Sequence, residues 1–226
     1  GGKRENKMSK KLKNWEELCN DGEQYGDIKS DLTPEQKIIF ESIKDQKVLK
    51  LQDAYLFIKR EEVTREHGIR LATIISDFKL LNSIRTIIVT HNNLGPEGIK
   101  ILAASSSLPK VDYLHLGSNN LGDDGVETIA TCDLFSEITT LNLENNGITE
   151  RGAKALATSP VLTKLTSLNL VDNRVRDQGA FSIANSDNLS GLIYLHLGGN
   201  QIKSEDAKKA LRESKKLTHL EKLKVF

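Results

Sequence analysis

Five asparagines at one fixed interval constrain the fold of this chain more than any other feature of its sequence. The segments around them share the pattern L-x-x-L-x-L-x-x-N-x-L, with other aliphatic residues in place of some leucines. The asparagines are Asn92, Asn119, Asn146, Asn173 and Asn200, each 27 residues after the one before. A constant period of this length is the signature of a repeat architecture.

The hydrophobic period changes within each unit. Leu114 and Leu116 alternate with other residues, the period of two that is typical of a strand with one buried face. Val126, Ile129 and Ala130 then follow at the helical spacing i, i+3, i+4. The other complete units show the same change, so the sequence predicts one short strand and one helix in each unit.

Residues typical of helix starts mark the beginning of several of these helices. Pro96 fits a first helical turn, while Thr149 and Ser204 are hydroxyl caps followed by an acidic residue. Glycines stand four residues after the last aliphatic residue of the pattern, where we expect them to let the helix approach its own strand. They are Gly98, Gly125, Gly152 and Gly179, and Asp206 takes this position in the fifth unit, which predicts looser packing or an end role.

Stacked units form a parallel sheet and join their apolar faces into one core, which a single unit cannot provide. The repeated asparagines fit this arrangement as structural residues. An amide side chain carries both donors and acceptors, so a buried row of them satisfies the backbone of turns that lie outside any sheet.

These repeats resemble the leucine-rich repeat family, and within it the ribonuclease-inhibitor-like class, whose long units follow LxxLxLxxNxLxxxGxxxLA. The resemblance covers about residues 84–226. It implies an α/β fold, a horseshoe-shaped solenoid with a parallel sheet on the concave side and helices on the convex side. It also implies a binding scaffold rather than an enzyme.

The patterns divide the chain into three regions. We expect residues 1–30 to be a mobile basic tail with a short helix, residues 31–83 to be a helical cap with a degenerate first repeat, and residues 84–226 to hold five complete repeats and a truncated sixth.

The degenerate first repeat follows from two signals. Thr33 predicts the start of a capping helix over about 34–45. If Leu49 corresponds to Ile87, this unit is eleven residues longer than the others, which places an insertion around residues 55–62. Such a divergent unit would cover the apolar end of the stack.

Composition narrows the kinds of partner that we expect this chain to bind and the compartment in which we expect it to act. Thirty-two Lys and Arg against 31 Asp and Glu leave a net charge of +1, so we expect neither a nucleic-acid nor a membrane partner. No apolar run suits a membrane helix or a signal peptide, which favours the cytoplasm, or the host cytosol for a secreted effector. The two cysteines, Cys19 and Cys132, are expected to be reduced, with Cys132 packed as a small apolar side chain.

Strand alternation determines which side chains face outward on the concave side. Tyr113 and Tyr194 are the best anchors, because tyrosine offers a large contact area with little loss of rotamer freedom. The candidate partner-binding residues are Tyr113, His115, Asn142, Glu144, Asn169, Asp172, Tyr194 and His196.

The sequence contains no arrangement of residues that is typical of a catalytic site. His115 and His196 lie three repeats apart, about 14 Å across three strands, which is too far for one metal ion or one proton relay. No phosphate-binding, zinc-hydrolase or nucleophile-elbow motif occurs. We therefore expect no catalytic residue, no metal and no cofactor.

The leading interpretation is a non-enzymatic scaffold that binds an unidentified protein through its concave face and adjoining loops. One alternative is an accessory or activator of a small GTPase, for which Arg85 is the candidate residue. Another is the recognition domain of a bacterial effector or signalling protein. We expect a monomer, with self-association through the C-terminal sheet edge as the alternative, although Lys222 and Lys224 would discourage edge pairing.

Overall fold

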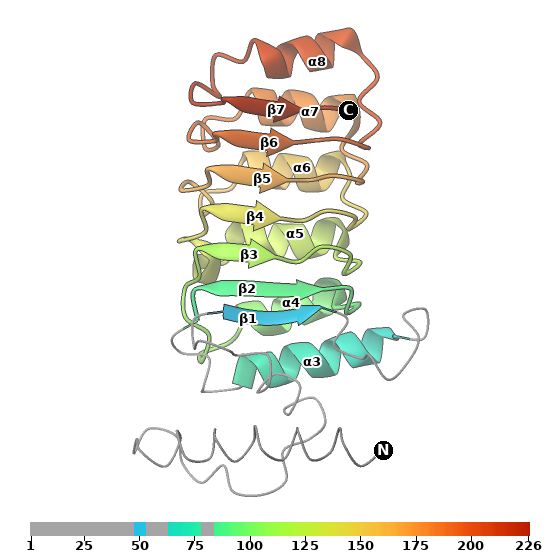
Figure 1. Ribbon diagram of the computed structural model, residues 1–226, viewed down its shortest axis with the longest axis vertical. Helices are drawn as coiled ribbons and strands as arrows, with labels where there is room; N and C mark the ends of the chain where they lie inside the picture. The colour runs from blue at the N-terminus through green and yellow to red at the C-terminus, as the bar shows by residue number, and fades with distance from the viewer. Residues whose placement is uncertain (1–47, 53–62, 78–83) are drawn as a thin grey trace, which may run out of the picture.

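The computed structural model describes residues 48–52, 63–77 and 84–226, in which strands and helices alternate (Figure 1). The strands are β1 (Val48–Gln52), β2 (Thr86–Thr90), β3 (Tyr113–His115), β4 (Thr140–Asn142), β5 (Ser167–Asn169), β6 (Tyr194–His196) and β7 (Lys222–Lys224). The helices are α3 (Arg65–Asp77), α4 (Gly95–Ala103), α5 (Gly122–Thr131), α6 (Glu150–Ala157), α7 (Arg176–Ala184) and α8 (Glu205–Arg212), with a 3-10 helix, η3 (Asp133–Phe135).

All seven strands form one parallel sheet in chain order, and equivalent residues of neighbouring units pair with each other. Leu114 pairs with Leu141, for example, and Leu141 with Leu168. Leu49 pairs with Ile87, as the alignment of the degenerate first repeat predicts. The α/β solenoid of stacked strand–helix units predicted from the sequence is therefore confirmed.

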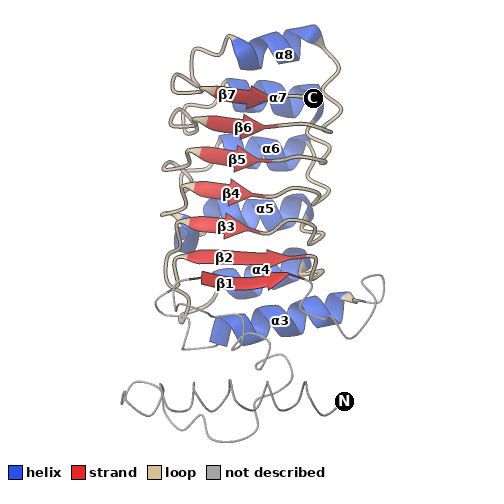
Figure 2. Ribbon diagram, viewed as in Figure 1, coloured by secondary structure: helices blue, strands red, loops and turns tan. Residues whose placement is uncertain are grey.

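The helices lie on one face of the sheet (Figure 2). The aliphatic residues of the repeat fill the space between the two layers: Leu141, Leu143 and Ile148 of one unit have no exposed surface. They form one continuous core with their counterparts from Leu49 to Leu217. None of the helices in the described ranges has the length and apolar character needed to cross a membrane.

The predicted asparagine ladder is confirmed. The Oδ1 atom of Asn146 accepts hydrogen bonds from the backbone N–H groups of Asn119 and Leu121, at 3.0 and 3.3 Å. Its Nδ2 donates to the carbonyls of Leu116 and Glu144, at 2.9 and 3.0 Å. Each amide thus connects the loops of two consecutive units. Equivalent bonds are made by Asn119, Asn173 and Asn200.

The predicted helix starts are also present. Pro96 lies in the first turn of α4. Thr149 accepts from the N–H of Arg151, and Ser204 accepts from those of Asp206 and Ala207.

The role assigned to the repeated glycines needs correction. A Cβ atom on Gly179 would lie 2.9 Å from the Cβ of Ala153 in helix α6 and 2.5 Å from a methyl group of Val175. The glycine therefore lets its helix approach the preceding helix and the loop residue of its own unit, rather than its own strand. Asp206, at the same position of the fifth unit, is exposed.

A second polar ladder, absent from our sequence analysis, runs along the ends of the helices. The hydroxyl of Ser159 donates to the carbonyl of Ala130 in the preceding unit, at 2.6 Å, and accepts from the N–H groups of Val161 and Leu162. Residues at the same position of their units donate in the same way. They are Ser105, Cys132, Ser186 and Ser214.

Cys132 therefore does more than pack as a small apolar side chain. Its thiol is half-buried and donates to the carbonyl of Ala103 at 3.4 Å, in the place where other units carry a serine.

Replacing Ser159 by alanine is expected to lower the free energy of unfolding by about 1–3 kcal/mol, because a buried carbonyl and two N–H groups lose their partner. Cys132→Ser is expected to leave stability unchanged or to raise it, because a hydroxyl is a better donor than a thiol. Urea unfolding of both variants checks this, and equal losses in the two would contradict a ladder of hydrogen bonds.

Some expectations from the sequence lie outside the described residues. They are the basic tail over residues 1–30, the capping helix over about 34–45 and the insertion around residues 55–62.

Candidate interaction surface

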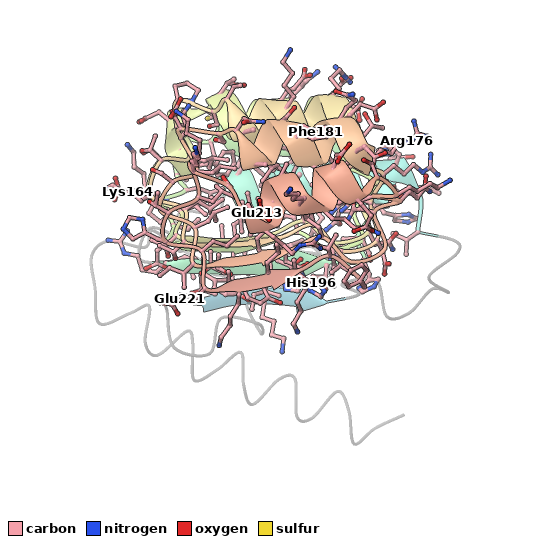
Figure 3. All side chains as sticks on the ribbon, turned by 90° about the horizontal axis from the view of Figure 1, so that it is seen from above. Lys164, Arg176, Phe181, His196, Glu213 and Glu221 are labelled. Atoms are coloured by element: carbon pink, nitrogen blue, oxygen red, sulfur yellow. The ribbon has the colours of Figure 1, made fainter. Side chains whose placement is uncertain are left out.

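The outward side chains of the strands form one surface, which we call the sheet face. Within β3 to β6 the middle residue of each strand is buried and its two neighbours are half-exposed. Seen along the stack in Figure 3, His196 lies on the sheet side and Phe181 on the helix side. The sheet face comprises the strand residues Lys50, Ile88, Tyr113, His115, Thr140, Asn142, Ser167, Asn169, Tyr194, His196, Lys222 and Lys224. Glu144, in the loop after β4, belongs to it through its contacts with His115 and Asn169.

Strand register brings the predicted partner-binding residues into rows. His115 is level with Asn142, Asn142 with Asn169, and Asn169 with His196. His115 and His196 are thus three strands apart, as the sequence predicts. Among the described residues, no group of three or more His, Cys, Asp or Glu is placed to hold a metal ion.

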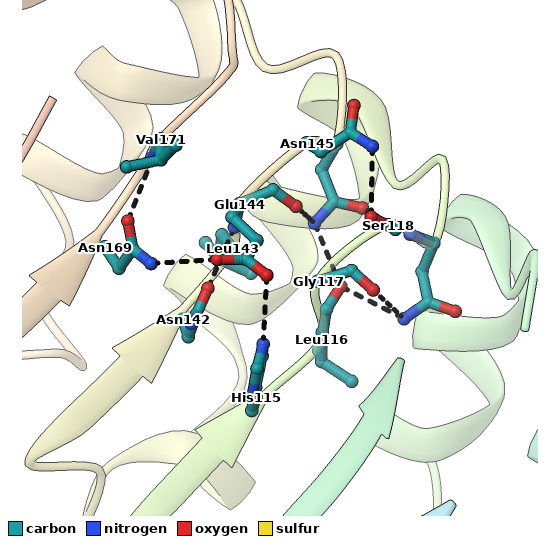
Figure 4. A network of polar contacts seen from close by, with 12 residues as sticks. His115, Leu116, Gly117, Ser118, Asn142, Leu143, Glu144, Asn145, Asn169 and Val171 are labelled. Carbon is teal, nitrogen blue, oxygen red and sulfur yellow. Dashed lines mark hydrogen bonds and ion pairs between the residues drawn. The ribbon is translucent and has the colours of Figure 1, made fainter. Parts of the chain in front are cut away.

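The centre of the sheet face is a polar cluster around Glu144 (Figure 4). The Oε2 atom of Glu144 accepts a hydrogen bond from the Nδ2 of Asn169, at 3.1 Å. Its Oε1 atom lies 3.7 Å from the Nε2 of His115. Glu144, in the loop after β4, therefore directs its carboxylate toward His115 of β3 on one side and accepts a hydrogen bond from Asn169 of β5 on the other.

Burial lowers the pKa of His115 below its usual value, and this effect outweighs the carboxylate of Glu144, which raises it. The neighbouring His91 also acts to lower this pKa, as the smallest of these effects. Because the imidazole is then neutral at pH 7, it does not compensate the negative charge of Glu144. The Nε2 of His115 is buried and has no hydrogen-bond partner within the described ranges.

Stability should therefore decrease as the pH falls below about 6.5. In that range the unfolded chain binds a proton at His115 that the folded chain resists binding, so acid favours unfolding. His115→Gln should reduce this loss, although His196, whose pKa is also lowered by burial, would retain part of it. Urea midpoints at about pH 7.5 and about pH 5.5 measure the effect, and an unchanged difference in the variant would contradict it.

The histidines depend on a glycine two residues later. A Cβ atom on Gly117 would lie 2.9 Å from both the Nε2 of His115 and the Cγ of Glu144. A Cβ atom on Gly198 would lie 3.1 Å from the Nε2 of His196. The sequence Tyr-Leu-His-Leu-Gly, which occurs at 113–117 and 194–198, thus has a geometric reason, because the glycine leaves room for the imidazole.

Two of the predicted partner-binding residues also have a structural role. The Oδ1 of Asn142 accepts from the N–H of Glu144, and that of Asn169 accepts from the N–H of Val171, each at 3.0 Å. These amides fix the backbone that follows the strand, so truncating them would disturb more than a contact surface.

The remaining predicted residues lie toward the C-terminal end. The rings of Tyr194 and His196 meet edge to face at 6.1 Å, and the tyrosine hydroxyl lies 3.3 Å from the Nδ1 of His196. Asp172 is exposed in a left-handed backbone conformation, with φ of 54°. Arg85, the candidate for GTPase activation, donates to the carbonyl of Lys110 at 2.8 Å.

A family model of repeated units matches the part of the chain that forms β2 to α7. A family model described as "Leucine Rich repeat" matches residues 81–103, 107–130, 138–157 and 161–184. No curated protein matches the chain. Among solved structures, the C-terminal domain of tropomodulin from Caenorhabditis elegans is similar, with a TM-score of 0.47 and 16% identity, over 66% of this chain and 89% of that one.

Proposed function

We propose that this leucine-rich repeat chain is a non-enzymatic scaffold that binds a protein partner through the sheet face and adjoining loops. Leucine-rich repeats generally mediate contacts between proteins, and their stacked units create extended concave surfaces. We also infer that the units are of the ribonuclease-inhibitor-like class, since each 27-residue unit carries an α-helix.

One observation carries this proposal. The sheet face is bare of helices in the described part of the chain (Figures 1 and 2). It presents a continuous half-exposed surface of tyrosine, histidine and amide side chains. Such residues are enriched at protein interfaces, where tyrosine contributes area and amides contribute hydrogen bonds.

The N-terminal units have a different role in this proposal. Leu49 in β1 and Leu71 and Ile75 in α3 have no exposed surface and belong to the common core. We propose that residues 31–83 close the N-terminal end of the stack, while residues 84–226 provide most of the sheet face.

The double variant Tyr113→Ala/Tyr194→Ala tests the function. We expect it to weaken capture of the partner by tenfold or more, because truncating interface anchors costs about 2 kcal/mol or more. Its melting temperature should remain nearly unchanged, because both side chains are half-exposed.

Lys154→Ala and Glu213→Ala, at exposed positions on helix α6 and at the end of α8, are the controls and should capture normally. Equal capture by the tyrosine variant and the controls would argue against binding at the sheet face.

A further inference from the structure

Charge alternates along the sheet face in the direction of the stack. Lys50 of β1 is level with Ile88, and Lys224 of β7 is level with His196. Glu144 follows β4, midway between them. Strand β4 is three strands away from both β1 and β7. A positive, a negative and a positive group therefore follow each other along the stack, with about 14 Å between neighbours.

These three charges have no strong internal partner. Glu144 is within ion-pair distance of His115 but of no Lys or Arg in the described ranges, and burial favours the neutral form of His115. Lys50 and Lys224 are exposed and form no ion pair with any described residue. Other lysines, such as Lys110, Lys164 and Lys216, pair with carboxylates of neighbouring units.

The structure holds Glu144 in place for a contact from outside. Asn169 donates to one carboxylate oxygen, and the Oδ1 of Asn142 accepts from the N–H of Glu144. Gly117 leaves the room that this side chain and His115 occupy. The Glu144 side chain still has 38% of its surface exposed. An oriented, uncompensated carboxylate of this kind favours a charge-assisted hydrogen bond from a cation.

We propose that the sheet face binds a polypeptide segment that crosses the strands along the stack, with a Lys or Arg at Glu144 and acidic side chains at Lys50 and Lys224. This inference rests on the proposed function and specifies the chemistry of the partner. A helical segment reaches such contacts with charges about nine or ten residues apart, at 1.5 Å per residue.

Complementary charges at this spacing give specificity and orientation. A segment of the opposite pattern would place like charges together at all three points, which opposes binding. The neighbouring Tyr113 and Tyr194 offer aromatic contacts to the same segment, including cation–π contacts to its basic residue.

Selection from a displayed library of random peptides tests the inference. Peptides of about 20 residues span all three charges as a helix. Those selected on the full chain at low salt should contain a basic residue with an acidic residue about nine or ten positions away on each side. Their affinity should fall tenfold or more in Glu144→Gln, which preserves the shape and the hydrogen bond from Asn169, and should remain unchanged in Glu213→Gln.

A charge exchange gives a readout that a structural effect would not produce. Lys224→Glu should weaken a selected peptide, and replacing one acidic residue of that peptide by lysine should restore binding to Lys224→Glu alone. Added salt should weaken the wild-type pair.

The outcomes separate this inference from the proposed function. Peptides that need Tyr113 and Tyr194 but bind Glu144→Gln equally well would overturn the charge pattern and leave the sheet face as the binding site. Peptides that are indifferent to the tyrosines and to Glu144, or failure to select any, would count against both.

Discussion

Asn146→Ala is expected to lower the free energy of unfolding by about 3–5 kcal/mol. The amide makes four hydrogen bonds, of which three are buried and one is partly buried: two with N–H groups and two with carbonyls of consecutive loops. Truncation leaves the two N–H groups without a partner and without access to water, and each such group costs about 1–3 kcal/mol. The two carbonyls lose one hydrogen bond each but keep those from the side chain of Asn119 and the N–H of Ser118. The loss is smaller than the sum because the loops relax.

Urea unfolding measures this loss against a matched variant. Asn185 is exposed at the end of α7, and its side chain makes one hydrogen bond, to the carbonyl of Phe181. Asn185→Ala should therefore lower stability by about 1 kcal/mol or less. If the two variants lost equal stability, the asparagine ladder would not hold the units together.

Gly179→Leu is expected to be the second strongly destabilising change, by about 3 kcal/mol or more, because overpacking is severe where helices are in contact. The contacts described above leave no space for a Cβ atom between α6 and α7, and a leucine adds three further carbon atoms there. The better helix propensity of leucine offsets about 1 kcal/mol of this loss.

Asp206→Leu is the matched control, since it places the same side chain at the equivalent position of the fifth unit, where residue 206 is exposed. It should change stability by less than about 1 kcal/mol, mainly through loss of an acidic residue from the first turn of α8. Thermal unfolding that gave similar losses for both variants would show that the glycine is not required for helix packing.

The features that the sequence predicts correctly are those set by the repeat itself. The 27-residue period fixes which residues pair, so it predicts the register of the strands and the burial of Leu114, Leu141 and Leu168. The same period places Asn119 over Asn146, where each amide reaches the next loop. The alignment of Leu49 with Ile87 follows because strand residues must share one buried face.

The features that the sequence does not predict depend on contacts between units. The serine ladder also has the 27-residue period, and Ser105, Ser159 and Ser186 carry that signal. Cys132 interrupts this series of serines. A serine in the sequence also does not by itself reveal that its hydroxyl donates to the end of the helix in the preceding unit. The contacts of Gly179 require the position of the neighbouring helix, which no periodicity gives.

The polar centre of the sheet face illustrates the same limit. Alternation predicts that His115 and Glu144 face outward, but their approach depends on side-chain torsions and on the space above Gly117. The side-chain oxygens of Asn142 and Asn169 likewise accept hydrogen bonds from the backbone that follows their own strands. The periodicity therefore identifies the members of the surface, and the coordinates show which of them act together.

Site-specific photo-crosslinking tests the central claim most directly. A benzophenone side chain replaces Tyr194 on the sheet face in one variant and Phe181 on the helix side in the other (Figure 3). The account predicts that the partner is crosslinked from position 194 and not from position 181. Crosslinking from position 181 alone would show that the partner binds the helices and would contradict it.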